Sequence, residues 1–373
     1  MLGALIGDIV GSVYEFNNIK TKDFPLFSKE SMYTDDSVMT LAVAEICQKG
    51  YINDKDKIID TLKKWGKAYP NAGYGGHFYG WVLGDDRKPY NSCGNGSAMR
   101  VSACGWYGRT EWEVKDYATK VTEVTHNHPE GIKGAVVTAL CIYYARIGKS
   151  KEFIKEYAER EYPEIKKLDY EELRRTYEHG PEICQVTVPQ ALYCFLISNS
   201  FEDCIRTTIS IGGDCDTTAA ISGAIAEAYY KDQITDEILD DILFRIPTPK
   251  NDCNANEVLK NFLEYKNKIE RRKEELFNTL TEYCRYSSIK YKDDNRYLSS
   301  IKLIIQTGEI VFVSRDRHLD IVTRKIPDWN RYEDMCIIDE LNDMVHFKMC
   351  EGDKYNGSYT YSIMLLKDEI YEE

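Results

Sequence analysis

Two short segments of this chain each place paired carboxylates and a hydroxyl directly before an apolar stretch. The first is Thr-Asp-Asp-Ser at residues 34–37, and the second is Gly-Gly-Asp-Cys-Asp-Thr at residues 212–217. Because Asp, Ser and Thr are favoured at helix N-termini, where their charge suits the helix dipole, either segment alone is explained by helix capping. A cap needs only one oxygen, however, and two adjacent acids repel each other unless a cation or solvent lies between them. The same surplus of acids occurring twice therefore favours a metal site.

The donor atoms in these two segments are carboxylate and hydroxyl oxygens. Oxygen donors without His or Cys suit a hard, six-coordinate cation. We therefore predict Mg²⁺ as the first choice and Mn²⁺ as the second. Four carboxylates from two segments could bracket two ions and offset charges that are costly to bury. The residues themselves leave open whether one ion or two are bound, and they do not identify a substrate.

The N-terminal segment, residues 3–15, repeats glycine every four positions. On a helix these glycines share one face, which predicts close packing against another helix. Asp8 and Glu15 are seven positions apart and also share a face, so this helix can aim two acids toward one place. We predict a mobile loop over residues 16–31, which would let Glu15 act as an acid or base carried on a lid.

Two further loops offer groups that could bind a ligand. Residues 94–97, Gly-Asn-Gly-Ser, run into an apolar helix and could present backbone N–H groups to a phosphate, although the same residues form ordinary turns. His126 and His128 lie two positions apart, where no cysteine or third histidine completes a zinc site. His126 could contact a sugar hydroxyl or a phosphate, or it could serve the structure of the loop alone.

The elements that carry these residues are predicted to be helices. From residue 1 to about 246, long stretches rich in Ala, Gly and Ile alternate with glycine-containing loops, and strand patterns are scarce. Residues 34–48, 132–148 and 217–230 show the small and apolar side chains of helices that are buried on most sides. We therefore predict an all-α main domain over residues 1–250.

The pattern changes beyond residue 250. A charged helix is predicted from about 256 to 283, so we assign residues 251–284 to a connecting helix. Four strand patterns with turn residues between them follow at 301–305, 309–313, 345–349 and 359–366. They predict a small β-rich, α+β domain over residues 285–373, whose role the sequence does not indicate.

Composition restricts the partners and the compartment. The formal net charge of −13 opposes binding to free nucleic acid or to anionic lipid. The 12 cysteines are scattered without CxxC spacing, which is typical of reduced thiols in the cytosol. No apolar run approaches the length of a membrane span. We expect a cytoplasmic protein with no membrane association, and a monomer as the default state.

Five motifs taken together resemble the ADP-ribosylglycohydrolase family. They stand in the family's order: GDIVGSVYE at residues 7–15, YTDDS at 33–37, GNGSAMR at 94–100, THNHPEGIKGA at 125–135 and GGDCDT at 212–217. The resemblance covers residue 1 to about residue 246. It implies an all-α fold with a cleft that holds a dinuclear magnesium centre.

The resemblance also implies roles for single residues. The metal ligands would be Thr34, Asp35, Asp36, Asp214, Asp216 and Thr217. Glu15 would be the acid on a flexible flap, and either it or a ligating aspartate, Asp35 or Asp216, would move the proton. The diphosphate would lie along Gly94, Asn95, Gly96 and Ser97, and His126 would contact the ADP-ribose. Two residues depart from the usual pattern: Ser37 replaces a threonine and keeps the hydroxyl, and Ser97 stands where some relatives have glycine.

The predicted function is Mg²⁺-dependent hydrolysis of the glycosidic bond that links ADP-ribose to an acceptor. The substrate would be an ADP-ribosylated protein or another ADP-ribosylated molecule. A metal-dependent phosphohydrolase or nucleoside hydrolase is the alternative enzyme, and a non-catalytic ADP-ribose-binding protein is the alternative of another class. The presence of Glu15 and of all six implied ligands argues against lost catalysis. The acceptor linkage cannot be read from the residues.

Overall fold

A computed structural model of the chain describes residues 1–177, 180–231, 233–269 and 271, together with six strands beyond residue 296. The chain divides into two compact units, Met1–Leu263 and Glu264–Glu373. The first unit carries every residue that the sequence marks for chemistry.

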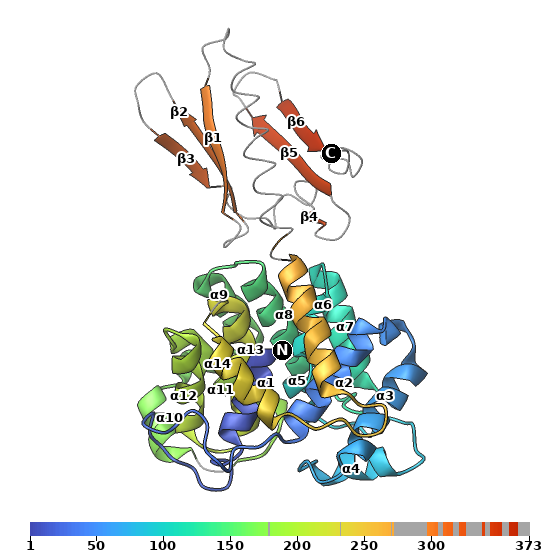
Figure 1. Cartoon of the computed structure of the whole chain (residues 1–373). Helices are drawn as coiled ribbons and strands as arrows, with labels where there is room; N and C mark the ends of the chain where they lie inside the picture. Colours follow the sequence, from blue (N-terminus) through green and yellow to red (C-terminus); the bar gives the residue numbers. More distant parts are fainter. Residues whose placement is uncertain are drawn as a thin grey trace. The chain divides into compact units, whose positions relative to one another are not determined.

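The first unit is built from helices (Figure 1). In chain order they are α1 (Leu2–Gly11), α2 (Asp35–Gln48), η1 (Tyr51–Asn53), α3 (Lys55–Ala68), α4 (Gly76–Leu83), α5 (Gly96–Met99), α6 (Ser102–Tyr107), α7 (Glu111–Glu123), α8 (Pro129–Arg146), α9 (Lys151–Glu161), η2 (Pro163–Lys167), α10 (Tyr170–Thr176), α11 (Cys184–Ile197), α12 (Phe201–Ile211), α13 (Cys215–Tyr230) and α14 (Asp236–Arg245). Up to residue 269, the described residues pair as β-structure only in isolated bridges. The predicted helical body is therefore confirmed.

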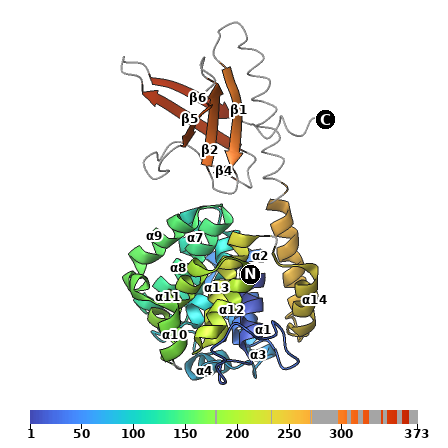
Figure 2. The same ribbon diagram turned by 90° about the vertical axis from the view of Figure 1, so that its left-hand side faces the viewer.

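Helices α1 and α13 lie side by side among the other helices (Figures 1 and 2). Their close approach depends on the glycine face of α1. A Cβ atom at Gly7 would lie 2.1 Å from the carbonyl oxygen of Ala219, and one at Gly11 would lie 2.4 Å from the Cα of Asp216. The close packing predicted for this face is confirmed, and it places the end of α1 directly against the start of α13.

This packing makes the glycine face a sensitive test of the fold. We expect Gly7→Ala to lower the free energy of unfolding by about 1–3 kcal/mol, because the added methyl group meets backbone atoms that cannot rotate away. The matched control is Gly80→Ala in α4, where the added Cβ meets nothing within 4 Å and the lost backbone freedom should stabilise the helix. Urea unfolding of both variants measures the difference. Equal stabilities would contradict the packing.

Residues 255–269 form a further helix. The buried ring of Phe262 meets Trp106 edge-on, with ring centroids 5.4 Å apart, and Gln48 Nε2 donates a hydrogen bond of 2.9 Å to the carbonyl oxygen of Val258. The first part of the predicted connecting segment therefore contributes to the core of the first unit. Residues 270 and 272–284 of that segment lie outside the described residues, and the boundaries at 250 and 284 stay predictions.

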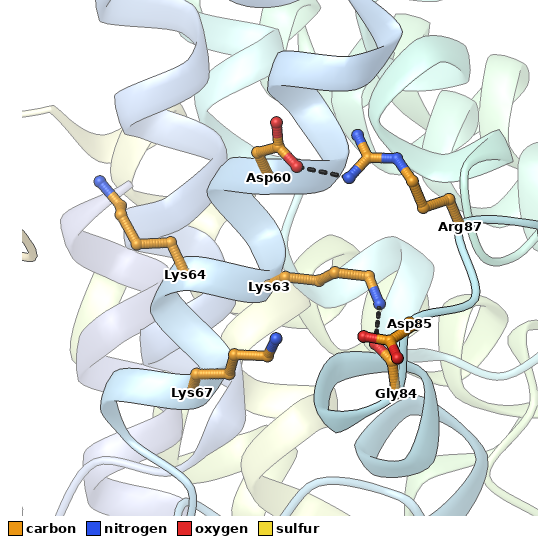
Figure 3. Close-up of a pocket in the computed structure, with 7 residues that line it drawn as sticks. All are labelled: Asp60, Lys63, Lys64, Lys67, Gly84, Asp85 and Arg87. Carbon is orange, nitrogen blue, oxygen red and sulfur yellow. Dashed lines mark hydrogen bonds and ion pairs between the residues drawn. The ribbon is translucent and has the colours of Figure 1, made fainter.

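A hollow of about 300 Å³ lies between α3 and the end of α4 (Figure 3). Two of its basic side chains, Lys63 and Arg87, hold these elements together. The Lys63 ammonium donates to the carbonyl oxygens of Trp81 and Gly84, which end α4, and Arg87 bonds Asp60 at 2.5 Å. The lining contains none of the predicted site residues. We interpret the hollow as part of the packing interface between α3 and α4.

The strands of the second unit form two antiparallel groups. The first has the order β1 (Tyr297–Ile304), β2 (Glu309–Arg315), β3 (Ile321–Lys325), and the second has the order β4 (Ile338–Asp339), β5 (Met344–Gly352), β6 (Ser358–Met364). Four of them overlap the predicted strand patterns, whose residues 305, 365 and 366 lie outside the described residues. The grouping of these strands into an independent β-rich domain stays a prediction.

Candidate metal centre and active site

The two acid segments meet at the N-terminal ends of α2 and α13, next to α1, which precedes both helices in the chain. Carboxylate oxygens of Asp8, Asp36 and Asp216 lie within 4.8 Å of one another, and so do those of Glu15, Asp214 and Asp216. All of these residues are buried except Glu15, which is half-buried. Asp216 belongs to both groups, so the site consists of two adjoining oxygen clusters with one shared carboxylate.

Asp8 is the one acid of these clusters to which the sequence analysis assigned neither a metal-binding nor a catalytic role. It accepts four hydrogen bonds from the start of α2: from the backbone N–H (3.0 Å) and hydroxyl (2.6 Å) of Thr34, and from the backbone N–H (3.0 Å) and hydroxyl of Ser37. Asp8 therefore fixes α1 to α2. The signal available in the sequence was a lone acid inside an apolar stretch. The prediction that Asp8 and Glu15 share a helix face is wrong, because α1 ends at Gly11 and Glu15 lies in the bend that follows it.

Asp36 joins the first acid segment to the second. Its Oδ2 accepts a hydrogen bond of 3.0 Å from the Thr217 hydroxyl, and a longer one of 3.4 Å from the Thr34 hydroxyl. Its Oδ1 is buried and has no hydrogen-bond partner within the protein. A buried carboxylate oxygen without a donor is costly, so this atom indicates a ligand of the opposite charge.

The pKa values of four acids at this site, Asp8, Asp35, Asp36 and Asp216, are shifted in the direction that such a ligand would reverse. Burial raises the pKa of Asp35, Asp36 and Asp216 well above its usual range, and the neighbouring carboxylates raise it further. Burial also raises the pKa of Asp8 to about 6, although its hydrogen bonds from Ser37 and Thr34 lower it. Without a cation, the folded site resists carrying its full negative charge. The residues present thus fit a hard cation.

Asp35 lies at the edge of this arrangement. It is half-buried and belongs to neither three-oxygen group among the described residues. Its Oδ1 lies beside Gly73, where an added Cβ would be 3.7 Å away. The structure therefore brings five of the acids into two compact clusters and places Asp35 beside them.

Asn95 links the glycine loop to the second acid segment. Its Nδ2 donates a hydrogen bond of 2.5 Å to Asp214 Oδ2 and another of 3.0 Å to the Thr187 hydroxyl. The side chain of Asp214 is thereby oriented by Asn95 and does not cap α13. Sequence reasoning assigned Asn95 to substrate binding, and the structure adds this contact with a candidate metal ligand.

His126 faces the same glycine loop. A Cβ at Gly94 or Gly96 would lie 3.5 Å or 3.4 Å from His126 Nε2, so the two glycines leave room beside this ring. His126 Nδ1 is hydrogen-bonded to the Thr125 hydroxyl at 2.8 Å. Burial, and then the charge of Arg100, lower the pKa of His126 well below its usual value, so the ring is neutral. A neutral imidazole beside a glycine loop can offer one nitrogen to a ligand.

The remaining residues of these loops have structural contacts. The Ser97 hydroxyl is fully buried and donates to the carbonyl oxygens of Gly94 (3.0 Å) and Gly131 (2.9 Å). His128 caps α8, because its Nδ1 accepts a hydrogen bond of 3.1 Å from the N–H of Glu130. The substrate-binding role of Ser97 stays a prediction. Its hydroxyl proton already forms hydrogen bonds within the protein.

Comparison with known proteins places this site in a family. The model of the ADP-ribosylglycohydrolase family matches residues 1–265, which contain both acid clusters, the glycine loop and His126. The chain belongs to the ADP-ribosylglycohydrolase family. It is therefore a glycohydrolase, and the family predicted from the five motifs is confirmed.

Several relatives within this family are similar to the chain. ADP-ribosylhydrolase ARH3 of Mus musculus is 29% identical over 304 residues, with 62% of this chain and 82% of that protein covered. The ADP-ribosyl dinitrogen reductase glycohydrolase of Rhodospirillum rubrum is 25% identical over 252 residues, with 61% and 83% covered. A solved structure of an ADP-ribosylglycohydrolase-related protein complex is 22% identical, with 71% of this chain and 96% of that chain covered and a TM-score of 0.49.

Proposed function

We propose that this glycohydrolase depends on Mg²⁺, with two ions held between the acid segments. The observation that carries the proposal is the pair of three-oxygen clusters that share Asp216, beside the buried, partnerless Oδ1 of Asp36. The proposed ligands are Thr34, Asp35, Asp36, Asp214, Asp216 and Thr217. Carboxylate and hydroxyl oxygens suit Mg²⁺, and Mn²⁺ is the second choice. When bound, the cations would supply positive charge next to the ribose hydroxyls of the scissile bond.

The residues of the chain would then bind and orient the substrate. We propose that Gly94, Asn95, Gly96 and Ser97 lie along the diphosphate and that His126 contacts the ADP-ribose. The glycines leave space beside His126 Nε2, and the neutral ring can donate or accept one hydrogen bond there. The phosphate would meet a loop that leads into a helix, although α5 itself spans only Gly96–Met99.

We propose that a carboxylate at or near Asp216, the residue that both clusters share, transfers the proton. Cleavage of a glycosidic bond passes through an oxocarbenium-like state, which nearby carboxylates stabilise. Glu15 is half-buried and lies within 4.8 Å of oxygens of Asp214 and Asp216, so it can reach both the site and solvent. We propose Glu15 as the residue that moves the proton, with Asp35 or Asp216 as the alternatives.

Release of free ADP-ribose tests this proposal. We expect Mg²⁺-dependent release from one of three substrates, linked through arginine, serine or a nucleic-acid base, and loss of release in EDTA. The responsive substrate identifies the linkage. Release of AMP or phosphate instead would show a phosphohydrolase. Binding of ADP-ribose without release from any substrate would show a non-catalytic binding protein.

The proposal extends to partner and compartment. We propose an ADP-ribosylated protein, or another ADP-ribosylated molecule, as substrate, and a cytoplasmic monomer as its context. In the described part of the chain no helix is both long and apolar enough to cross a membrane. The nine cysteines between residues 1 and 253 are free thiols, which supports a reducing compartment. We also propose that residues 285–373 form a β-rich domain, since their described strands pair antiparallel.

A further inference from the structure

The segment that follows Glu15 is attached to the turn that precedes Asp214. Asn18 and Gly213 form a pair of hydrogen bonds: Gly213 N–H donates to Asn18 Oδ1 at 2.7 Å, and Asn18 Nδ2 donates to the Gly213 carbonyl at 3.1 Å. The same Nδ2 donates to the carbonyl oxygens of Tyr14 (2.8 Å) and Glu15 (2.9 Å). The second oxygen cluster consists of Glu15, Asp214 and Asp216. One side-chain amide therefore holds the two backbone segments that supply Glu15 and Asp214 to this cluster.

Lys20 adds a second attachment to the same turn. Its ammonium donates to the carbonyl oxygens of Ile211 and Tyr177. Gly212 has a φ of +83°, and a Cβ there would lie 2.4 Å from Lys20 Nζ and 2.7 Å from Asn18 Oδ1. The turn and the segment are thus fitted to each other at a position that favours glycine.

The rest of the predicted mobile loop is attached elsewhere. Arg206 Nη1 donates to the carbonyl oxygens of Lys22 (3.0 Å) and Phe24 (2.5 Å), and Arg245 Nη2 donates to that of Ser28 (3.3 Å). Phe24 is buried, whereas Phe16 is 85% exposed. Arg206 of α12 and Arg245 of α14 thus hold the later part of this loop, whereas Asn18 holds the part next to Glu15.

We propose that Asn18 is a positioning residue for the second oxygen cluster. Glu15 lies three residues before Asn18, and Asp214 follows its partner Gly213 directly. Oxygens of Glu15, Asp214 and Asp216 lie within 4.8 Å of one another, so the Asn18 amide sets the spacing between the two backbone segments that supply this cluster. The inference rests on the proposed metal function. It states that Asn18 increases the affinity of the site for one of the two proposed cations. Lys20 supports the same spacing.

Titration of the full-length protein with Mg²⁺ tests the inference by calorimetry. We expect Asn18→Ala to weaken one of two binding events about 10- to 100-fold, the range seen when a group that orients metal ligands is removed, and to leave the other event unchanged. The matched control is Asn17→Ala, which alters the exposed neighbouring asparagine and should keep both affinities. Lys20→Met, which removes the ammonium group and keeps most of the unbranched side chain, should weaken the same event less.

Each outcome of the titration tests a different part of the proposal. Wild-type protein that binds no Mg²⁺ would contradict the proposed metal centre itself. Wild-type protein with two binding events, both retained in Asn18→Ala, would overturn the positioning role and leave the metal centre intact. If Asn18→Ala does not fold, Lys20→Met provides the test. Unchanged Mg²⁺ affinities in that variant would overturn the inference, because contacts that serve only the fold would not weaken one binding event and spare the other.

Discussion

Replacing Asp216 by asparagine is expected to lower kcat at least about 10³-fold, with little residual release of ADP-ribose at saturating Mg²⁺. Asp216 is the one carboxylate that belongs to both oxygen clusters. Its amide replacement keeps the size of the side chain but removes the negative charge from both positions. Asp214→Asn should show the same direction of change, because Asp214 belongs to the second cluster and is oriented by Asn95.

The measurement is the initial rate of ADP-ribose release over a range of Mg²⁺ concentrations. Asp240→Asn, which alters an exposed aspartate in α14, serves as the control and should retain the wild-type rate. Binding of ADP-ribose by calorimetry shows whether the variant still holds the product. A near-normal kcat for Asp216→Asn would remove the basis for a metal centre at this position.

The parts of this site that could be predicted from sequence are local patterns. The acid pairs at residues 35–36 and 214–216 stand before apolar helices, and both carboxylate type and helix position are visible in a few consecutive residues. The same holds for the glycine loop. The helical body follows from periodicity in long segments, and the glycine face of α1 predicts a close neighbour without saying which helix it is.

What could not be predicted depends on contacts between distant segments. Asp8 joins the cluster because α1 packs on α13, which lies more than 200 residues later in the chain. The contact of Asn95 with Asp214 spans 119 positions. The loop after Glu15 has no periodic pattern, and its anchors Arg206 and Arg245 come from helices far along the sequence. Its predicted mobility stays a prediction. A pattern read along the chain cannot show such pairings.

The metal-free protein is expected to lose stability as the pH rises from 3.8, the ordinary pKa of an aspartate, through about 6, the folded-state pKa of Asp8. In this window the folded protein keeps protons that the unfolded chain has already released, so raising the pH favours unfolding. Asp8 alone accounts for roughly 3 kcal/mol on this basis. Asp35, Asp36 and Asp216 shift in the same direction.

Unfolding in urea, followed by tryptophan fluorescence at several pH values, measures this loss. Trp65, Trp81 and Trp106 are buried in the first unit and report on it. Acids whose pKa is lowered by folding contribute with the opposite sign, as the pH rises toward their ordinary pKa. The pKa of Glu45 is lowered, since hydrogen bonds from Lys49, Lys64 and Trp65 outweigh its burial. The comparison that isolates the site is therefore between proteins in EDTA and in Mg²⁺, and between the wild type and Asp36→Asn.

A cation between the carboxylates favours their ionised form, so Mg²⁺ should lower their folded-state pKa and stabilise the protein most at the higher pH. Asp36→Asn removes a carboxyl whose Oδ1 is buried without a partner. In EDTA this variant should be more stable than the wild type near neutral pH and should show a shallower pH dependence, because one buried charge is gone. It should also gain less stability from Mg²⁺. If the free energy of unfolding of the wild type has the same pH dependence with and without Mg²⁺, the clustered acids do not hold a cation. The folded protein would then relieve the repulsion among these acids by binding protons.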